Sequence, residues 1–246
     1  MLHTPLTHRG SIPTTRRCRT EIAKAYFFDL DGTLTDARHG LYLSFRAALS
    51  TLDIPEMSDE DLHRFLGTPL PEMFRVLKPG ISTLQITAGI NAFRSAYEDA
   101  GIVQNALYPG ALRLLAAIAR KGAVAWVVTS KPEHYAVRIL RDLRINRYLQ
   151  GVIGAGLDET DTKTELIARA LVAANVDNTD AIMLGDRHYD IIGALENRIM
   201  PIGALWGYGS YDELYTAGCR HFVNSLDEFL EAFVGAEERT HVKCPG

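Results

Sequence analysis

The sequence has few cysteines, and their arrangement suggests no metal or redox site. Cys18, Cys219 and Cys244 lie far apart and form no Cys-x-x-Cys pair, which argues against zinc-ribbon and dithiol chemistry. An odd and sparse set of thiols fits a reducing compartment. We therefore expect all three cysteines to be structural or incidental, in a cytoplasmic protein.

Long apolar runs and an excess of basic residues are also missing. The longest strongly apolar stretch, Ala123 to Val128, has the length of a strand and not of a membrane-spanning helix. The formal net charge of −4 gives no basic footprint for a nucleic acid polymer or for an anionic membrane. The 246 residues, 47% hydrophobic and 23% charged, are instead typical of a folded domain with room for an insert.

The N-terminal segment differs from the rest in composition. Residues 1–20 contain no acidic residue but four arginines, and they lack the apolar core of a secretory signal. The composition loosely resembles an organelle transit peptide. Because no apolar period is present, we expect a disordered extension over residues 1–22, and we assign residues 237–246 to a C-terminal tail.

Strand-like and helix-like segments alternate through most of the chain, which predicts an α/β fold with a Rossmann-like parallel sheet. The expected strands are 25–28, 123–129, 152–153, 181–185, 200–205 and 221–223. The expected helices between and after them are 111–121, 132–143, 161–174, 190–196 and 226–234. Residues 38–105 show only helical periodicity, over 40–52, 58–66, 70–77 and 82–100. We therefore predict a core domain of residues 23–37 and 106–236, with an all-helical cap domain of residues 38–105 inserted after the first strand.

Two carboxylates follow the first expected strand. The apolar run Ala25–Phe28 leads into Asp29 and Asp31, and then into Gly32. An unpaired buried carboxylate is costly, whereas the carboxyl ends of parallel strands are where open α/β sheets bind ligands. Asp-x-Asp-Gly is also a common turn. This stretch alone leaves both interpretations open.

Later strand and helix ends carry further polar residues. Thr129 and Ser130 end the second strand before a helix expected to hold Pro132 in its first turn, an arrangement that can bind an anion or simply cap the helix. Lys163 opens a helix, where a lysine is unfavourable for the helix dipole unless it balances a nearby negative charge. Asp186 follows the strand 181–185, and Asp190 lies four residues later.

Four acidic groups around one cleft would repel one another unless a cation neutralised them. Mg²⁺ prefers hard oxygen ligands and a phosphate partner. The pattern therefore predicts a magnesium site at this edge of the sheet.

Together these motifs resemble those of the haloacid dehalogenase-like phosphohydrolases. The matching residues are Asp29-Leu30-Asp31-Gly32-Thr33, Thr129-Ser130, Lys163, and Gly185-Asp186 with Asp190, in the family's order. The resemblance covers residues 23–234. The helical insert resembles the small cap of the phosphoglycolate phosphatase-like subgroup.

The resemblance implies a role for each motif residue. Asp29 would attack phosphorus and form an aspartyl-phosphate, and Asp31 would act first as general acid and then as general base. Mg²⁺ would be held by Asp29, by the backbone carbonyl of Asp31 and by Asp186. Phosphate would be bound by Thr129, Ser130 and Lys163, with Gly32 and Asp190 in supporting roles.

The resemblance implies a Mg²⁺-dependent phosphatase for a small phosphorylated metabolite, of the phosphoglycolate type. The run Thr129-Ser130-Lys131-Pro132 also resembles 5'-nucleotidases, and a β-phosphoglucomutase-type phosphomutase would use the same core and cap. A non-catalytic binding protein would have no need of both Asp29 and Asp31. We expect Phe65–Glu72 to contact the substrate, with Arg46 and Arg75 as candidate anion contacts, and the protein to be a monomer or homodimer.

Overall fold

The computed structural model describes residues 23–157 and 160–235. The extension expected over residues 1–22 and the tail expected over residues 237–246 lie outside these ranges, as do Cys18 and Cys244. Among the described residues, every helix is too short or too polar to cross a bilayer.

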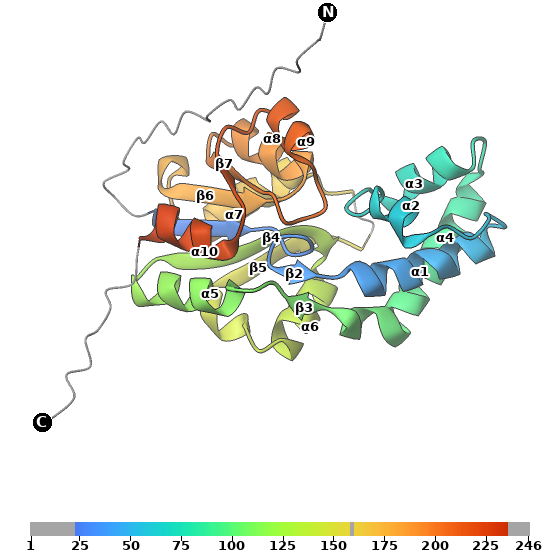
Figure 1. Cartoon of the computed structure of the whole chain (residues 1–246), viewed down its shortest axis with the longest axis horizontal. Coiled ribbons are helices and arrows are strands. Elements are labelled where there is room, and N and C mark those ends of the chain that lie inside the picture. Colours follow the sequence, from blue (N-terminus) through green and yellow to red (C-terminus); the bar gives the residue numbers. More distant parts are fainter. Residues whose placement is uncertain (1–22, 158–159, 236–246) are drawn as a thin grey trace, which may run out of the picture.

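A parallel sheet forms the centre of the protein (Figure 1). Its six strands have the order β5-β4-β1-β6-β7-β8, which confirms the predicted α/β class. Their bounds are β1 Ala25–Phe28, β4 Val124–Pro132, β5 Gly151–Ala155, β6 Ala181–Gly185, β7 Met200–Ala204 and β8 Phe222–Val223.

The central strand β1 is buried on both faces. Tyr26 and Phe28 pack in the larger apolar cluster, whereas Ala25 and Phe27 pack in a second cluster across the sheet, as expected from the alternation of side chains along a strand. On the first face lie α5 (Ala111–Arg120), α6 (Glu133–Asp142) and α10 (Leu226–Phe229); on the second lie α7 (Lys163–Ala174) and α8 (His188–Glu196) (Figure 1).

The strand register brings three chain segments to one edge of the sheet. Phe28, the last residue of β1, pairs with Val127 of β4 on one side and with Leu184 of β6 on the other. All three strands run in parallel. The residues that follow this level therefore emerge side by side, which is how segments distant in sequence come to share a site.

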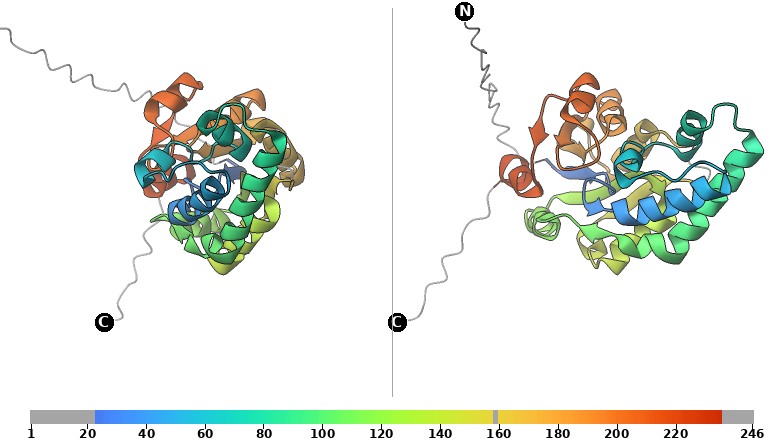
Figure 2. Two further views of the ribbon diagram at one scale, coloured as in Figure 1. Left: turned by 90° about the vertical axis from the view of Figure 1, so that its right-hand side faces the viewer. Right: turned by 45° about the vertical axis from the view of Figure 1, so that its right-hand side comes forward.

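The predicted cap segment is helical throughout its main elements. It contains α1 (Arg38–Thr51), α2 (Asp59–His63), α3 (Leu70–Leu77) and α4 (Thr83–Ala96), followed by a π-helical turn (Tyr97–Gly101) and a 3₁₀ turn (Ile102–Gln104). A capping box between Ser82 and Gln85 starts α4. These helices gather at one end of the molecule (Figure 2).

Two short strands lie where the predicted cap segment joins the predicted core. β2 (Thr35–Asp36) and β3 (Ala106–Leu107) pair in antiparallel fashion, and the backbone N–H of Tyr108 donates to Leu34 O at 3.0 Å. Neither strand was expected, because two residues carry no periodic signal. The helix α9 (Tyr211–Thr216) was also missed.

The end of β4 differs from the prediction. The strand continues to Pro132, which has extended backbone and precedes α6 as its N-cap rather than lying in its first turn. Its pairing with β5 shifts register between Thr129 and Pro132. The shift marks a β-bulge that inserts Ser130 and Lys131, and such bulges bend a strand and re-aim its side chains.

Candidate active site

Lys163 joins three groups at the edge of the sheet. Its Nζ atom lies 2.8 Å from Asp29 Oδ1 and 2.8 Å from Asp190 Oδ1, and it donates to Val128 O at 3.0 Å. Burial lowers the pKa of Lys163, but Asp190 and Asp29 outweigh this effect and hold the pKa above its ordinary value. Lys163 is the first residue of α7, whose start is fixed by a capping box between Thr162 and Glu165.

Asp186 and Asp190 are buried beside this lysine. Asp186 accepts hydrogen bonds from Thr33 Oγ1 and from the backbone N–H of Tyr208, each at 2.8 Å. Burial and the charges of Asp29 and Asp190 raise the pKa of Asp186 well above its ordinary value. Burial, opposed by Lys163, raises the pKa of Asp190 to about 6.

The residues at this site fit a divalent cation. Carboxylate oxygens of Asp29, Asp186 and Asp190 all lie within 4.8 Å of one another; we call these three residues the carboxylate cluster. Lys163 supplies one cation for three carboxylates, and both burial and the mutual repulsion of the carboxylates raise the pKa values of Asp186 and Asp190. A cation with a preference for oxygen ligands, such as Mg²⁺, would reduce that repulsion.

Three glycines allow backbone to pack directly against Asp186. Gly32 has a φ of +89°, and a Cβ atom there would overlap the Asp186 carboxylate; Cβ atoms at Gly207 and Gly209 would overlap Asp186 as well. The loop that contains Trp206 also donates from Trp206 Nε1 to Thr33 O at 3.1 Å. Asp186 is therefore enclosed on several sides, and its orientation is fixed by packing.

Asp31 is not part of the carboxylate cluster and has contacts of its own. Its Oδ2 atom lies 2.5 Å from Lys131 Nζ, and its Oδ1 atom accepts from Thr35 Oγ1 at 3.3 Å. Burial, opposed by Lys131, raises the pKa of Asp31. Lys131 was not among the residues predicted for the site, although it directly follows the Thr129-Ser130 motif.

The Thr129-Ser130 motif divides into a buried and an exposed residue. Thr129 is buried, and its Oγ1 atom accepts from the backbone N–H of Lys131 at 3.3 Å. Ser130 is exposed. The Thr129 hydroxyl thus shapes the bulge at the end of β4, beside the Lys163 contact with Val128.

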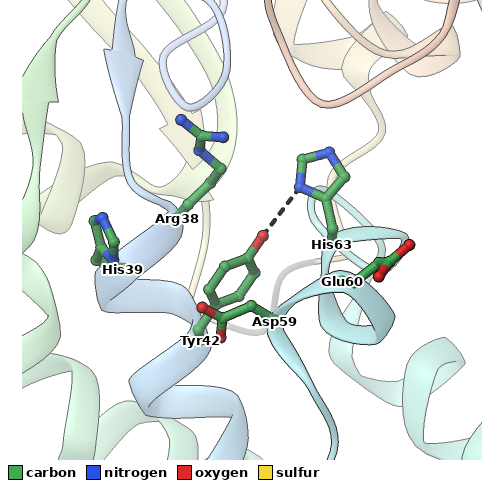
Figure 3. A pocket seen from close by; sticks show the side chains of 6 residues that line it. All are labelled: Arg38, His39, Tyr42, Asp59, Glu60 and His63. Atoms are coloured by element: carbon green, nitrogen blue, oxygen red, sulfur yellow. Dashed lines mark hydrogen bonds between the residues drawn. The ribbon is translucent and has the colours of Figure 1, made fainter.

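A cavity of about 370 Å³ lies between α1 and α2 (Figure 3). Within it, Tyr42 Oη and His63 Nδ1 are 3.0 Å apart. The His63 ring meets the Tyr208 ring edge to face, with centroids 6.2 Å apart. The backbone N–H of Tyr208 binds Asp186, so Tyr208 links the carboxylate cluster to the His63 side of the cavity. The lining residues are Arg38, His39, Tyr42, Asp59, Glu60 and His63.

Of the residues expected to contact substrate, only some lie near the cavity or Asp186. Arg38, rather than Arg46, lines the cavity, and Arg46 is 2.6 Å from Asp59 in an ion pair within the cap. Arg75 is exposed. In the loop Phe65–Glu72, Gly67 has a φ of +78° and lies against the Arg187 side chain, next to Asp186. Gly67 of this loop therefore lies against the residue that follows Asp186, and contact of the loop with substrate stays a prediction.

The carboxylate cluster makes stability depend on pH in a testable way. The pKa of Asp190 rises from 3.8 to about 6 on folding. Its stabilising contribution is therefore complete below 3.8 and is lost as the pH rises through about 6. In EDTA we expect a melting temperature several degrees lower at about pH 7 than at about pH 5, with a smaller difference in Asp190→Asn. An equal pH dependence in that variant would contradict the assignment.

Comparisons with known proteins agree with the motifs. Residues 26–204 match the family model described as haloacid dehalogenase-like hydrolase. A 5'-nucleotidase from Pseudomonas aeruginosa is 35% identical over 200 residues, which cover 81% of this chain and 90% of the relative. The tyrosine-protein kinase PtkA from Mycobacterium tuberculosis is 34% identical over 216 residues, 86% of this chain and 73% of the relative.

Solved structures show the same fold. The crystal structure of a predicted phosphatase from Clostridium acetobutylicum aligns with a TM-score of 0.80 and 36% identity, covering 85% of this chain and 97% of that one.

Phosphoglycolate phosphatase 1 from Pseudomonas aeruginosa is a more distant relative in sequence. It is 24% identical over 196 residues, which cover 77% of this chain and 72% of the relative. The chain therefore belongs to the haloacid dehalogenase-like hydrolases, as its four motifs indicated.

Proposed function

We propose that this hydrolase is a Mg²⁺-dependent phosphatase that cleaves nucleoside 5'-monophosphates through an aspartyl-phosphate. The observation that carries the catalytic part is the contact of Lys163 with both Asp29 and Asp190 at 2.8 Å, beside Asp186. Lys163 engages Oδ1 of Asp29 and leaves Oδ2 to attack phosphorus. The result is a nucleophile that is oriented by a buried cation.

Two chemical steps follow from this arrangement. In the first, Asp29 bonds to phosphorus, the ester P–O bond breaks, and Asp31 gives its proton to the departing alkoxide. In the second, Asp31 takes a proton from water, which attacks the aspartyl-phosphate, releases inorganic phosphate and restores Asp29. A Mg²⁺ ion held by Asp29, Asp186 and the Asp31 carbonyl, with Asp190 nearby, would reduce the repulsion between the phosphate and the attacking carboxylate.

The cavity between α1 and α2 supports a nucleoside as the leaving group. Asp59 and Glu60 line it, and the guanidinium of Arg38 is already paired with Asp36. Arg46 already pairs with Asp59, so a carboxylate such as that of phosphoglycolate would meet the further negative charge of Glu60 there, whereas a neutral nucleoside offers hydroxyl and amine donors. The volume of about 370 Å³ lies within the range of small-molecule sites, and the similarity to a 5'-nucleotidase points the same way.

Release of inorganic phosphate from a substrate panel tests this function. The panel contains adenosine 5'-monophosphate, phosphoglycolate, p-nitrophenyl phosphate and β-glucose 1-phosphate. We expect the highest kcat/KM with adenosine 5'-monophosphate. A preference for phosphoglycolate would contradict the nucleoside assignment and favour the phosphoglycolate type. Isomerisation of the sugar phosphate without free phosphate would indicate a phosphomutase.

His63 is expected to contribute to nucleoside binding. Replacing His63 with alanine removes its ring from the cavity and its contact with Tyr42, so the KM for adenosine 5'-monophosphate should rise about tenfold, the effect of losing one aromatic contact. The KM for p-nitrophenyl phosphate should change much less. His221→Ala, on an exposed histidine beside the edge strand β8, is the matched control. Equal increases of KM for both substrates would exclude His63 from nucleoside recognition.

A further inference from the structure

Lys131 is a buried lysine that the two chemical steps above do not use. The bulge in β4 turns its side chain inward, where it is 8% exposed. Its Nζ atom lies 2.5 Å from Asp31 Oδ2 and donates to the Tyr97 hydroxyl at 2.8 Å. The ammonium also lies 4.5 Å from the centroid of the Tyr97 ring, a cation–π distance.

Tyr97 holds this lysine from the cap side. It belongs to the π-helical turn after α4 and is 1% exposed. Its ring stacks on Phe93 of the cap, with centroids 5.9 Å apart, and meets Tyr135 of the core edge to face at 5.5 Å. The Tyr97 hydroxyl also accepts from Asn105 Nδ2 at 3.4 Å. Cap and core therefore both define where the Lys131 ammonium sits.

These contacts hold the carboxyl group of Asp31 mainly through Oδ2, which Lys131 binds. The Thr35 hydroxyl lies 3.3 Å from Oδ1 and shares its one hydrogen with Leu30 O at 3.2 Å. Lys131 uses two of its three N–H donors on Asp31 and Tyr97, which leaves little capacity to bind a phosphate group. Each of the two aspartates that follow β1 therefore contacts a different lysine: Asp29 contacts Lys163, and Asp31 contacts Lys131.

We propose that Lys131 is a positioning residue, which together with Tyr97 holds Asp31 where it can transfer protons to the leaving group and from water. This inference rests on the proposed two-step phosphatase mechanism. A lysine side chain is long and flexible, so the hydroxyl and ring of Tyr97 are needed to keep the ammonium, and hence the carboxyl group, in one place.

Leaving groups of different basicity test the inference. In Lys131→Met, kcat for adenosine 5'-monophosphate should fall about 100-fold, the usual contribution of a positioned acid or base, with little change in KM. p-Nitrophenolate departs without a proton. This variant should therefore release one burst of p-nitrophenolate per enzyme, followed by slow turnover, because the second step still needs Asp31 as base. Rapid-mixing absorbance measurements resolve the two phases.

Two further variants keep the test interpretable. Tyr97→Phe retains the ring and loses the hydroxyl, so it should fold normally and lower kcat for adenosine 5'-monophosphate about fivefold, the effect of one hydrogen bond. Lys121→Met, on an exposed lysine after α5, should behave as the wild type. Circular dichroism confirms folding.

The outcomes separate this inference from the proposed function. A raised KM with unchanged kcat in Lys131→Met would make Lys131 a substrate-binding residue, and an equal loss with both substrates without a burst would make it structural; either result overturns the inference alone. An unchanged kcat for adenosine 5'-monophosphate in both Lys131→Met and Tyr97→Phe would also overturn the inference. A wild-type protein that hydrolyses neither substrate would overturn the proposed function, and the inference with it.

Discussion

Asp29→Asn should lower phosphate release by at least about 10⁴-fold, as expected when a catalytic nucleophile is removed, and leave the fold intact. The amide has the shape of the carboxylate but is a poor nucleophile and cannot form an aspartyl-phosphate. Lys163 keeps its ion pair with Asp190 at 2.8 Å, so the buried ammonium is not left alone. Phosphate release and thermal melting of the same preparation measure the two effects separately.

A matched exchange elsewhere controls for the loss of a carboxylate. Asp53 is exposed, with a φ of +51°, a backbone conformation that asparagine also tolerates. Asp53→Asn should retain full activity. Residual activity above about one hundredth of wild type in Asp29→Asn, far more than removal of a nucleophile permits, would show that another residue attacks phosphorus.

Removal of divalent cations should reduce phosphatase activity to the background rate, and addition of Mg²⁺ should restore it. The physical reason is the repulsion among Asp29, Asp186 and Asp190, whose oxygens lie within 4.8 Å of one another, together with the charge of the incoming phosphate. Lys163 alone cannot balance these charges. Phosphate release after dialysis against EDTA, and then in a Mg²⁺ titration, measures this dependence.

A binding measurement separates cation loss from other effects of the chelator. A ligand that binds only the folded state stabilises it according to its concentration and affinity, so Mg²⁺ should raise the melting temperature of the wild type by several degrees. Asp186→Asn should abolish this shift and most of the activity, whereas Asp142→Asn, on an exposed residue of α6, should preserve both. A full Mg²⁺ shift in Asp186→Asn would place the cation elsewhere.

The sequence predicted those parts of the fold that have a periodic signal. Ala25–Phe28 is apolar because both faces of β1 are buried, and this made Asp29 stand out at the end of the strand. The strand β6 similarly located Asp186. The two-residue strands β2 and β3 gave no such signal, and the π-helical turn after α4 has nearly the same apolar spacing as a helix.

The contacts around Asp31 could not be predicted from spacing. Lys131 reaches Asp31 because a bulge adds residues to β4, and a bulge depends on register with a strand far along the chain. Tyr97 looked like one more apolar position of a long helix, and only packing reveals its hydroxyl against Lys131. The enclosure of Asp186 by Gly207 and Gly209 is likewise a contact through space, between segments without a shared motif.

The two short strands that join core and cap also have a mechanical consequence. β2 and β3 pair through Thr35 with Leu107 and through Asp36 with Ala106, so the cap is attached at two neighbouring points instead of one. A single connection would leave the helical segment free to rotate about many backbone bonds. Two hydrogen-bonded strands side by side restrict that rotation, which favours one placement of Tyr97 against Lys131.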